Sequence, residues 1–269
     1  MSVYYFINTA ISNGLLKEVL KTGLICVGSK GCGKSNAVKV ITRELLVRGL
    51  ADVKVFDLAL NWLFDFEQLP YQLVEDDTTI INAKNCIYDF TLTYNHNQIN
   101  YTMQRLMKRD YHNKARMKLV CDGQIYNRLV YIIEEAQNVI GSSALRGKEN
   151  HFWLKAISTS RNIGLSYIFI GQRLSDISTK AVERCNGYLL GKMTGDNDLR
   201  KVKALGGKEL RRQVKQLEVG SFIYYNGDKT EQIDFPLFES YGRPKPYLET
   251  QPTVEMGSGL FARIKEWIK

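Results

Sequence analysis

The segment with the clearest chemical meaning covers residues 28–35 and reads G-x-x-x-x-G-K-S. In such a loop, backbone N–H groups surround phosphate oxygens, the lysine reaches the β- and γ-phosphates, and the serine hydroxyl ligates Mg²⁺. The sequence therefore predicts a site for ATP and Mg²⁺, with Lys34 as a catalytic group and Ser35 as a metal ligand. The residues predicted to bind the nucleotide are Gly28, Ser29, Lys30, Gly31, Cys32, Gly33, Lys34, Ser35 and Asn36.

Two adjacent carboxylates, Glu134 and Glu135, directly follow the apolar run 129–133. A strand that ends in acidic residues, downstream of a phosphate loop, is typical of enzymes that hydrolyse the nucleotide. One carboxylate is needed near the metal ion, and another polarises the attacking water. We assign Glu134 to Mg²⁺ and Glu135 to the water, which predicts hydrolysis rather than binding alone.

Two further polar residues follow predicted strands at the edge where parallel sheets bind ligands. Gln172 comes after the strand 165–170 and is predicted to be a catalytic group that senses the γ-phosphate; its alternative is a loop amide. Asp57 ends the strand 53–56 and is predicted either to support the metal site or to cap a turn.

The elements that must position these residues follow from the apolar pattern. The run 24–27 predicts a buried strand before the phosphate loop, and the spacing over 36–47 predicts a helix closed by Gly49. The fold class is therefore α/β, with a mainly parallel sheet flanked by helices. Further strands are predicted at 78–81, 86–93, 187–190 and 221–225, the last followed by an Asn226-Gly227 turn, and helices at 10–21, 152–161, 197–205 and 208–217.

Composition indicates a globular chain that either binds a polyanionic partner, nucleic acid before an anionic membrane, or is simply a basic soluble enzyme. The 269 residues carry a net charge of +9, and two segments concentrate the basic side chains. Each segment is either a DNA-contacting surface or a plain solvated helix face. The basic residues are Arg105, Lys108, Arg109, Lys114, Arg116 and Lys118 in the first segment, and Arg200, Lys201, Lys203, Arg211, Arg212 and Lys215 in the second.

The cysteines and the first residues of the chain indicate the cellular compartment of the protein. Five cysteines, an odd number without a C-x-x-C pair, favour reduced thiols in a cytosol-like compartment and no zinc site. The start of the chain predicts no signal peptide, and no apolar run approaches a membrane span. We therefore expect a cytoplasmic protein.

The sequence changes character after residue 234. Four of the five prolines lie beyond that point, which predicts an extended tail over 235–259 after a domain that covers 1–234. Residues 260–269 have the spacing of a short amphipathic helix. It is predicted to dock on a partner, such as a neighbouring subunit, a capsid protein or a membrane surface, or else on its own domain.

The residues around the second half of the sheet carry a family resemblance. Residues 158–177 contain a serine–arginine pair, a glycine, a hydrophobic strand and then Gln-Arg-x-x-Asp-Ile. Together with the phosphate loop and the two glutamates, this pattern resembles the HerA/FtsK superfamily of P-loop DNA-translocating ATPases over residues 24–225. The chain is too short for the additional domains of many members. In its minimal form it looks like the genome-packaging ATPases of membrane-containing and archaeal icosahedral viruses.

The resemblance implies a RecA-like sheet and a homo-oligomeric ring, a hexamer, around double-stranded DNA. It also implies nucleotide sites at subunit boundaries, with an arginine supplied by the neighbour, for which Arg161 is the first candidate and Arg146 the second. Arg161 precedes a strand, so it is expected at the sheet edge opposite its own phosphates. Its alternative is a structural arginine that ties a helix to the sheet. Glu134 departs from the family's usual aspartate.

Three functional hypotheses remain open at this point. The first is a ring motor that hydrolyses ATP to move double-stranded DNA into a viral capsid, which places the protein in the host cytoplasm or with the virion. The second is a translocase for DNA transfer or DNA processing. The third is an assembly or secretion protein that uses the nucleotide as a switch and moves no DNA.

Overall fold

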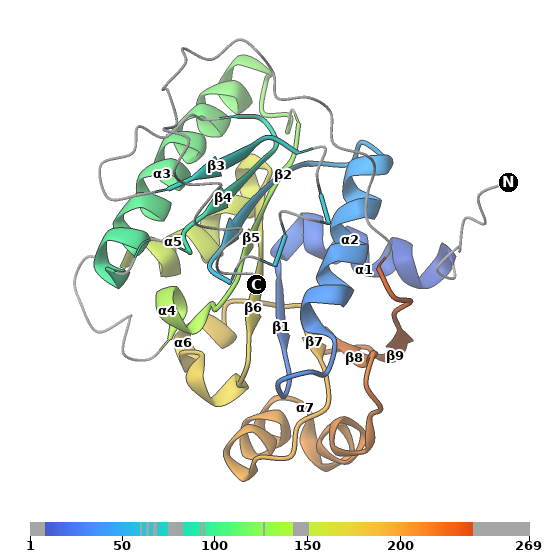
Figure 1. Ribbon diagram of the computed structural model, residues 1–269. Helices are drawn as coiled ribbons and strands as arrows, with labels where there is room; N and C mark the ends of the chain where they lie inside the picture. The colour runs from blue at the N-terminus through green and yellow to red at the C-terminus, as the bar shows by residue number, and fades with distance from the viewer. Residues whose placement is uncertain are drawn as a thin grey trace, which may run out of the picture.

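The computed structural model describes residues 9–59, 61–62, 65–66, 69–74, 83–91, 93, 95–125, 127–141 and 151–238. These residues form a nine-stranded sheet in the order β3-β4-β2-β5-β6-β1-β7-β8-β9, with helices on both faces (Figure 1). The strands are β1 (Leu24–Val27), β2 (Asp52–Asp57), β3 (Tyr71–Leu73), β4 (Cys86–Asp89), β5 (Leu129–Ile133), β6 (Leu165–Gly171), β7 (Tyr188–Leu190), β8 (Ser221–Tyr225) and β9 (Thr230–Asp234). The α-helices are α1 (Thr9–Thr22), α2 (Lys34–Val47), α3 (His96–Val120), α4 (Gln137–Ile140), α5 (His151–Thr159), α6 (Thr179–Val182) and α7 (Asp196–Gln216).

The sheet is parallel from β3 to β7 and ends in an antiparallel hairpin. Strand β1 lies between β6 and β7, so that Val27 is level with Gly171 on one side and Leu190 on the other. Strands β8 and β9 pair antiparallel across the predicted turn at Asn226. The expected α/β fold with a mainly parallel sheet is confirmed. All loops that leave the carboxyl ends of β1, β5 and β6 meet at one edge.

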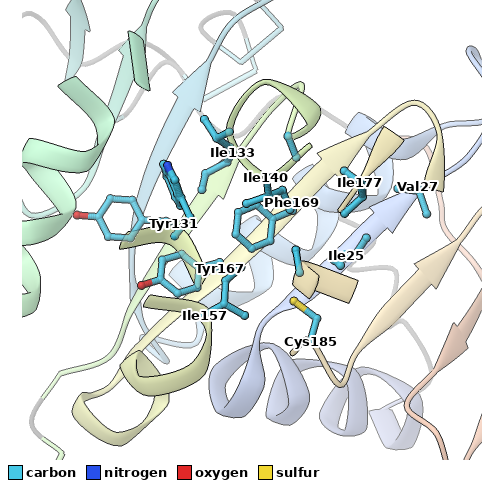
Figure 2. Packing of buried hydrophobic residues seen from close by; sticks show 14 of the residues in the cluster. Ile25, Val27, Tyr131, Ile133, Ile140, Ile157, Tyr167, Phe169, Ile177 and Cys185 are labelled. Carbon is cyan, nitrogen blue, oxygen red and sulfur yellow. The ribbon is translucent and has the colours of Figure 1, made fainter. Parts of the chain in front are cut away.

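The central strands are apolar along their whole length because both of their faces are covered. In β1, Leu24 and Cys26 belong to the core under α1 and α2, whereas Ile25 and Val27 belong to the core on the other face. That second core contains residues of α3, α4, α5, α6 and α7, and aromatic rings of β5 and β6 fill its centre (Figure 2). Rigid strands fixed from both faces hold the loops at their ends in register.

Most predicted elements agree with the structure, and the differences have local causes. The predicted strand 86–93 ends early, at Asp89, because the Asp89 carboxylate accepts hydrogen bonds from the N–H and hydroxyl of Thr91 and closes a turn. The predicted helix 152–161 becomes α5 and a 3₁₀ turn, η3 (Ser160–Ile163), which ends at Gly164 with φ 78°. A second 3₁₀ turn, η4, covers Leu174–Asp176.

The remaining elements include one that was missed and one that the structure does not test. Strand β3 was not predicted, and the predicted strand 78–81 lies outside the described residues. The two helices predicted after β7 form the two halves of α7, which kinks where Gly207 has φ 82°. No described helix is both long and apolar enough to cross a membrane.

Candidate functional site

The phosphate loop joins β1 to α2 at the carboxyl edge of the sheet. Gly31 and Gly33 have φ of 79° and 98°, a left-handed conformation that glycine adopts without strain. Gly28 is required for another reason, because a Cβ there would lie 2.7 Å from Cys32 Sγ and 3.1 Å from the Gly191 backbone. The sequence therefore builds a tight loop that enters directly into a helix.

The first turn of α2 supplies backbone donors to this loop. The first intrahelical hydrogen bond runs from Ala37 N–H to Gly33 O, at 2.9 Å, so the N–H groups of residues 34–36 precede it. Such N–H groups have no acceptor within the helix and, with the helix dipole, form an anion site. Lys34 Nζ donates to the carbonyl oxygens of Gly28 and Ser29, at 2.8 and 2.9 Å, which holds a positive charge over the loop.

An open cleft of about 310 Å³ lies beside the loop and collects the ends of β1, β5 and β6. Most of the residues predicted to do chemistry meet there, including both glutamates and Gln172. The lining residues are Lys30, Gly31, Lys34, Ser35, Asn61, Glu134, Glu135, Ile170, Gly171 and Gln172.

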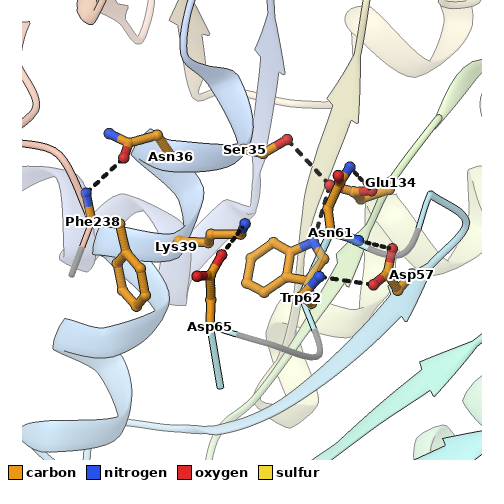
Figure 3. Close-up of polar contacts among 9 residues, drawn as sticks. All are labelled: Ser35, Asn36, Lys39, Asp57, Asn61, Trp62, Asp65, Glu134 and Phe238. Atoms are coloured by element: carbon orange, nitrogen blue, oxygen red, sulfur yellow. Dashed lines mark hydrogen bonds and ion pairs between the residues drawn. The ribbon is translucent and has the colours of Figure 1, made fainter. Parts of the chain in front are cut away.

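Glu134 is almost fully buried at the inner side of this cleft, with 3% of its surface exposed. Its Oε1 accepts from the Ser35 hydroxyl at 3.2 Å and from the Trp62 indole N–H at 3.0 Å, and its Oε2 accepts from Asn61 Nδ2 at 3.0 Å (Figure 3). Burial raises the pKa of Glu134, and the Asp57 carboxylate raises it further, whereas these hydrogen bonds lower it.

Asp57 caps a turn, the second of its two predicted roles. Its Oδ1 accepts from the backbone N–H of Ala59 at 3.0 Å. Oδ1 also accepts from the N–H of Asn61 at 3.2 Å, and Oδ2 from that of Trp62 at 2.9 Å (Figure 3). Burial raises the pKa of Asp57, while the three N–H donors lower it. Asp57 therefore reaches the site indirectly, through the turn that carries Asn61 and Trp62.

Glu135 lies at the outer side of the cleft in an unusual conformation. Its φ of 45° is uncommon for a residue with a side chain and costs about 1–3 kcal/mol, so the surroundings must impose it. The next residue, Ala136, donates to the carbonyl of Ile170 on β6 at 2.8 Å. Gln172 Nε2 donates to Glu135 Oε1 at 3.0 Å, and the Gln137 amide donates to Oε2.

Two of the predicted nucleotide-binding residues direct their side chains away from the cleft. The Asn36 amide donates to Pro236 O at 2.8 Å. It also accepts from Phe238 N–H at 2.7 Å (Figure 3), so it fixes the start of the predicted tail. Cys32 is buried behind the loop, where burial raises the pKa of its thiol. Only their backbone groups remain for the nucleotide.

The first candidate arginine, Arg161, is not in the cleft. Arg161 is exposed in η3, at the edge where β6 begins, whereas Gln172 follows the end of β6. The seven residues of β6 separate them, which is on the order of 20 Å at the usual rise of a strand. Arg146 lies outside the described residues.

Sequence reasoning missed Asn61 and Trp62, which lie in the segment that was hardest to interpret. The only signal was Asp57 at a strand end with polar and aromatic residues four and five positions later, a pattern shared by many ordinary turns. The contact joins residues 72 positions apart, from Trp62 to Glu134, and no local pattern encodes it.

The arrangement fits a nucleotide with a bound magnesium ion. The hydroxyl of Ser35 and the carboxylate of Glu134 are the hard oxygen ligands that Mg²⁺ prefers, and they already touch each other. Within the ranges the structure describes, no group of three or more His, Cys, Asp or Glu side chains forms a protein-only metal cage. Proteins commonly bind Mg²⁺ through one or two carboxylates together with substrate phosphates and water, which is the role that the Ser35 and Glu134 side chains suit.

Comparison with solved structures shows the fold. The genome-packaging NTPase B204 from Sulfolobus turreted icosahedral virus 2, solved with ATP-γ-S, matches 80% of this chain and 97% of its own, with a TM-score of 0.58 and 18% identity. The pCW3 conjugation coupling protein TcpA matches 82% of this chain and 62% of its own, with a TM-score of 0.58 and 14% identity.

VirB4 of Thermoanaerobacter pseudethanolicus matches 79% of this chain and 89% of its own, with a TM-score of 0.54 and 12% identity. No protein-family model matches the sequence, and a search of curated proteins found no significant match. The structural neighbours agree with the expected resemblance at the level of the fold.

Proposed function

We propose that the protein is an Mg²⁺-dependent ATPase whose subunits form a ring that translocates double-stranded DNA, as in packaging a viral genome. The observation that carries the ATPase part is one cleft in which Lys34, Ser35 and Glu134 adjoin the Glu135–Gln172 pair. Lys34 supplies fixed positive charge to the phosphates. Ser35 and Glu134 would hold Mg²⁺, which would supply positive charge against the phosphates when bound.

Glu135 and Gln172 serve the attacking water. Glu135 accepts hydrogen bonds from two neutral amides and keeps its carboxylate at the open side of the cleft, where it polarises water. Gln172 follows the end of β6 and donates to the Glu135 carboxylate. Because it also lines the cleft beside the phosphate loop, it can contact the γ-phosphate and Glu135 with the same side chain.

The DNA part of the proposal is supported by charge and by the neighbours. The net charge is +9, and exposed basic side chains lie along helices α3 and α7. Figure 1 shows α7 at the end of the sheet that carries the loop between β1 and α2, whereas α3 lies against the other half of the sheet. Asp198 of α7 accepts from Ser175 N–H at 2.8 Å, just after Gln172, so α7 is joined to the nucleotide edge.

The ring part rests on Arg161. An exposed arginine on the order of 20 Å from its own cleft serves catalysis only in a neighbour's cleft. Such an arginine stabilises the charge of the transition state and contributes about 10³- to 10⁵-fold to kcat. The alternative is a structural arginine at the entry to β6.

The central experiment is an ATPase assay with Mg²⁺, with and without duplex DNA, beside the mass of the particle. We expect hydrolysis that duplex DNA stimulates, by an oligomer, and a loss of about 100-fold or more in kcat for Lys34→Ala. Wild-type turnover in Lys34→Ala contradicts the ATPase assignment. Hydrolysis that duplex DNA leaves unchanged, by a protein that does not bind DNA, favours the nucleotide-switched assembly protein.

DNA binding is tested by charge reversal in each helix separately. Phosphate contacts release counterions, so affinity should fall steeply with salt and show no base preference. Reversal at Arg211 and Arg212, or at Arg105, Lys108 and Arg109, should weaken binding to all duplexes alike. Because α7 adjoins Gln172, we expect its reversal also to abolish DNA stimulation of hydrolysis. Unchanged binding in both variants contradicts the motor.

The trans role of Arg161 is tested by mixing subunits. Arg161→Ala and Glu135→Gln rings should each be inactive, but a mixed ring has some interfaces with Glu135 on one side and Arg161 on the other. Partial recovery on mixing is expected. A mixture that stays inactive, while mixing with wild type shows exchange, excludes Arg161 from the neighbour's site.

The predicted C-terminal helix lies outside the described residues, and its role stays a proposal. We propose that it docks on a capsid protein, a membrane surface or a neighbouring subunit, in a protein that works in the host cytoplasm or with the virion. Removal of residues 260–269 should leave basal hydrolysis intact and impair assembly or docking. A deletion variant without ATPase activity would place the helix in the core.

A further inference from the structure

The residue pair Asn61 and Trp62 gives the buried Glu134 carboxylate two of its three side-chain donors. Trp62 has no exposed surface, and its indole N–H lies 3.0 Å from Glu134 Oε1. Asn61 Nδ2 lies 3.0 Å from Oε2, on the cleft side. A buried N–H needs an acceptor, and a buried carboxylate needs donors, so each satisfies the other.

Trp62 is held too firmly to follow the carboxylate. Its backbone N–H is fixed by Asp57, its ring stacks on Phe66 with centroids 5.4 Å apart, and the Lys39 ammonium lies 5.7 Å from the ring centroid. Lys39 is itself paired with Asp65 (Figure 3). A donor anchored at this many points sets the position of its acceptor rather than the reverse.

The length of the Glu134 side chain matches this donor. Glu134 Oε1 spans the gap between Trp62 Nε1 on one side and Ser35 Oγ on the other, at 3.0 and 3.2 Å. An aspartate is shorter by one carbon–carbon bond, about 1.5 Å, and loses the indole contact unless the backbone of β5 moves. Strand β5 cannot move easily, because β2 and β6 pair with it on both sides.

We propose that Trp62 and Asn61 are positioning residues that orient Glu134 toward the magnesium ion. We further propose that position 134 carries a glutamate rather than an aspartate because only the longer side chain reaches the Trp62 indole N–H. The inference rests on the proposed function, since it concerns the metal side of the same cleft. Groups that orient a metal ligand typically contribute about 10- to 100-fold to metal affinity.

The test is a double-mutant cycle on Mg²⁺ affinity, measured by calorimetric titration of ATP-γ-S over a series of Mg²⁺ concentrations and in EDTA. Trp62→Phe keeps the stacked ring and removes the N–H. It should raise the half-saturating Mg²⁺ concentration about 10- to 100-fold and leave the affinity in EDTA unchanged. In a Glu134→Asp background, which lacks the contact, Trp62→Phe should cause no further loss.

Trp153→Phe is the matched control, because Trp153 is also fully buried and its indole N–H also has a partner, Asn100 Oδ1 at 2.7 Å. It should leave the Mg²⁺ titration unchanged. The tryptophans also give a spectroscopic readout, since the chain has only three. An emission change on adding Mg²⁺ with ATP-γ-S should persist in Trp153→Phe and disappear in Trp62→Phe.

Several results overturn the proposal. A Trp62→Phe loss that is equal in EDTA and in Mg²⁺, or equal in the Glu134→Asp background, means that Trp62 only supports the fold. If Trp62→Phe does not fold, as judged by thermal unfolding, Asn61→Ala replaces it, because Asn61 is exposed at the cleft. Asn61→Ala must then shift the same Mg²⁺ titration, and an unchanged titration contradicts the proposal. If the wild-type protein shows no Mg²⁺-dependent nucleotide binding, the proposed function itself is wrong.

Discussion

Glu134 and Glu135 are neighbours in sequence but belong to two differently built sides of the cleft. Glu134 is buried, and its donors come from the start of α2 and from the turn after β2. Glu135 is half-buried, and its partners are the amides of Gln137 and Gln172. The metal side, around Glu134, is held by an aromatic frame that consists of the stacked rings of Trp62, Phe66 and Phe238. The water side, around Glu135, consists of exposed or half-buried polar groups on a strained backbone.

The difference separates two chemical tasks. A metal ligand must be held in place before the metal arrives, and a fixed, desolvated carboxylate is destabilised until a cation compensates it. A group that polarises water must instead exchange protons and adjust as the reaction proceeds, which needs access to the cleft. The comparison supports our proposal that Glu134, on the buried side, serves metal binding and that Glu135, on the open side, serves turnover.

The largest effect is expected from Glu135→Gln, which removes the water-polarising charge and keeps the shape. The kcat should fall by about 10²- to 10⁴-fold, while Mg²⁺-dependent ATP binding is retained. Single-turnover hydrolysis and equilibrium binding of ATP-γ-S measure the two quantities. Glu183→Gln, an exposed glutamate after α6, is the control and should behave as wild type.

Glu134→Gln should show the opposite split. The half-saturating Mg²⁺ concentration should rise by about 10- to 100-fold, because the ligand loses its charge and one of its acceptor oxygens. Binding in EDTA should change little. If titrations show instead that Glu134→Gln retains Mg²⁺-dependent binding and Glu135→Gln loses it, the assignments of the two glutamates are exchanged.

The two sides also differ in how far the sequence predicts them. Lys34, Ser35 and the two glutamates follow strands whose apolar runs are unmistakable, and parallel strands bring their ends together, so sequence alone places them in one cleft. Gln172 follows from the same logic, because β6 is adjacent to β1. The water side was therefore almost completely predicted, apart from Gln137 and the left-handed φ of Glu135.

The sequence predicts Ser35 and Glu134 but not the residues that hold Glu134, because these lie in an irregular stretch of chain. Asn61 and Trp62 reach Glu134 only through a turn closed by Asp57, and turn closure depends on a side-chain hydrogen bond that many Asp residues could form. Likewise, no periodicity indicates that the Asn36 side chain binds residues 200 positions away at Pro236. Such contacts are set by tertiary packing rather than by local pattern.

A smaller effect is expected from Gln172→Ala. The hydrogen bond from Gln172 to Glu135 is worth about 0.5–1.5 kcal/mol, which corresponds to a loss of roughly 2- to 10-fold in kcat with little change in Mg²⁺ affinity. Steady-state kinetics at saturating and limiting Mg²⁺ measure both. A change in Mg²⁺ affinity as large as that of Glu134→Gln would show that the two sides are not independent.

The smallest effect on catalysis is expected from Phe238→Ala, which tests whether the outermost ring of the aromatic frame matters for turnover. Phe238 stacks on Phe66 with centroids 5.0 Å apart, and Phe66 stacks on Trp62 beside Glu134. Loss of the outermost ring removes an aromatic pair worth about 0.5–1.5 kcal/mol plus its buried area, so the melting temperature should fall by a few degrees.

The kcat of Phe238→Ala should stay near wild type, because Phe66 and Asp57 still fix Trp62. Leu237→Ala is the control, since Leu237 is 88% exposed and its truncation should not change the melting temperature. Thermal unfolding and ATPase assays on the same preparations decide the outcome. A fall in turnover comparable to that of Glu135→Gln would mean that the start of the tail is part of the catalytic unit, and the aromatic frame would then serve turnover as well as metal binding.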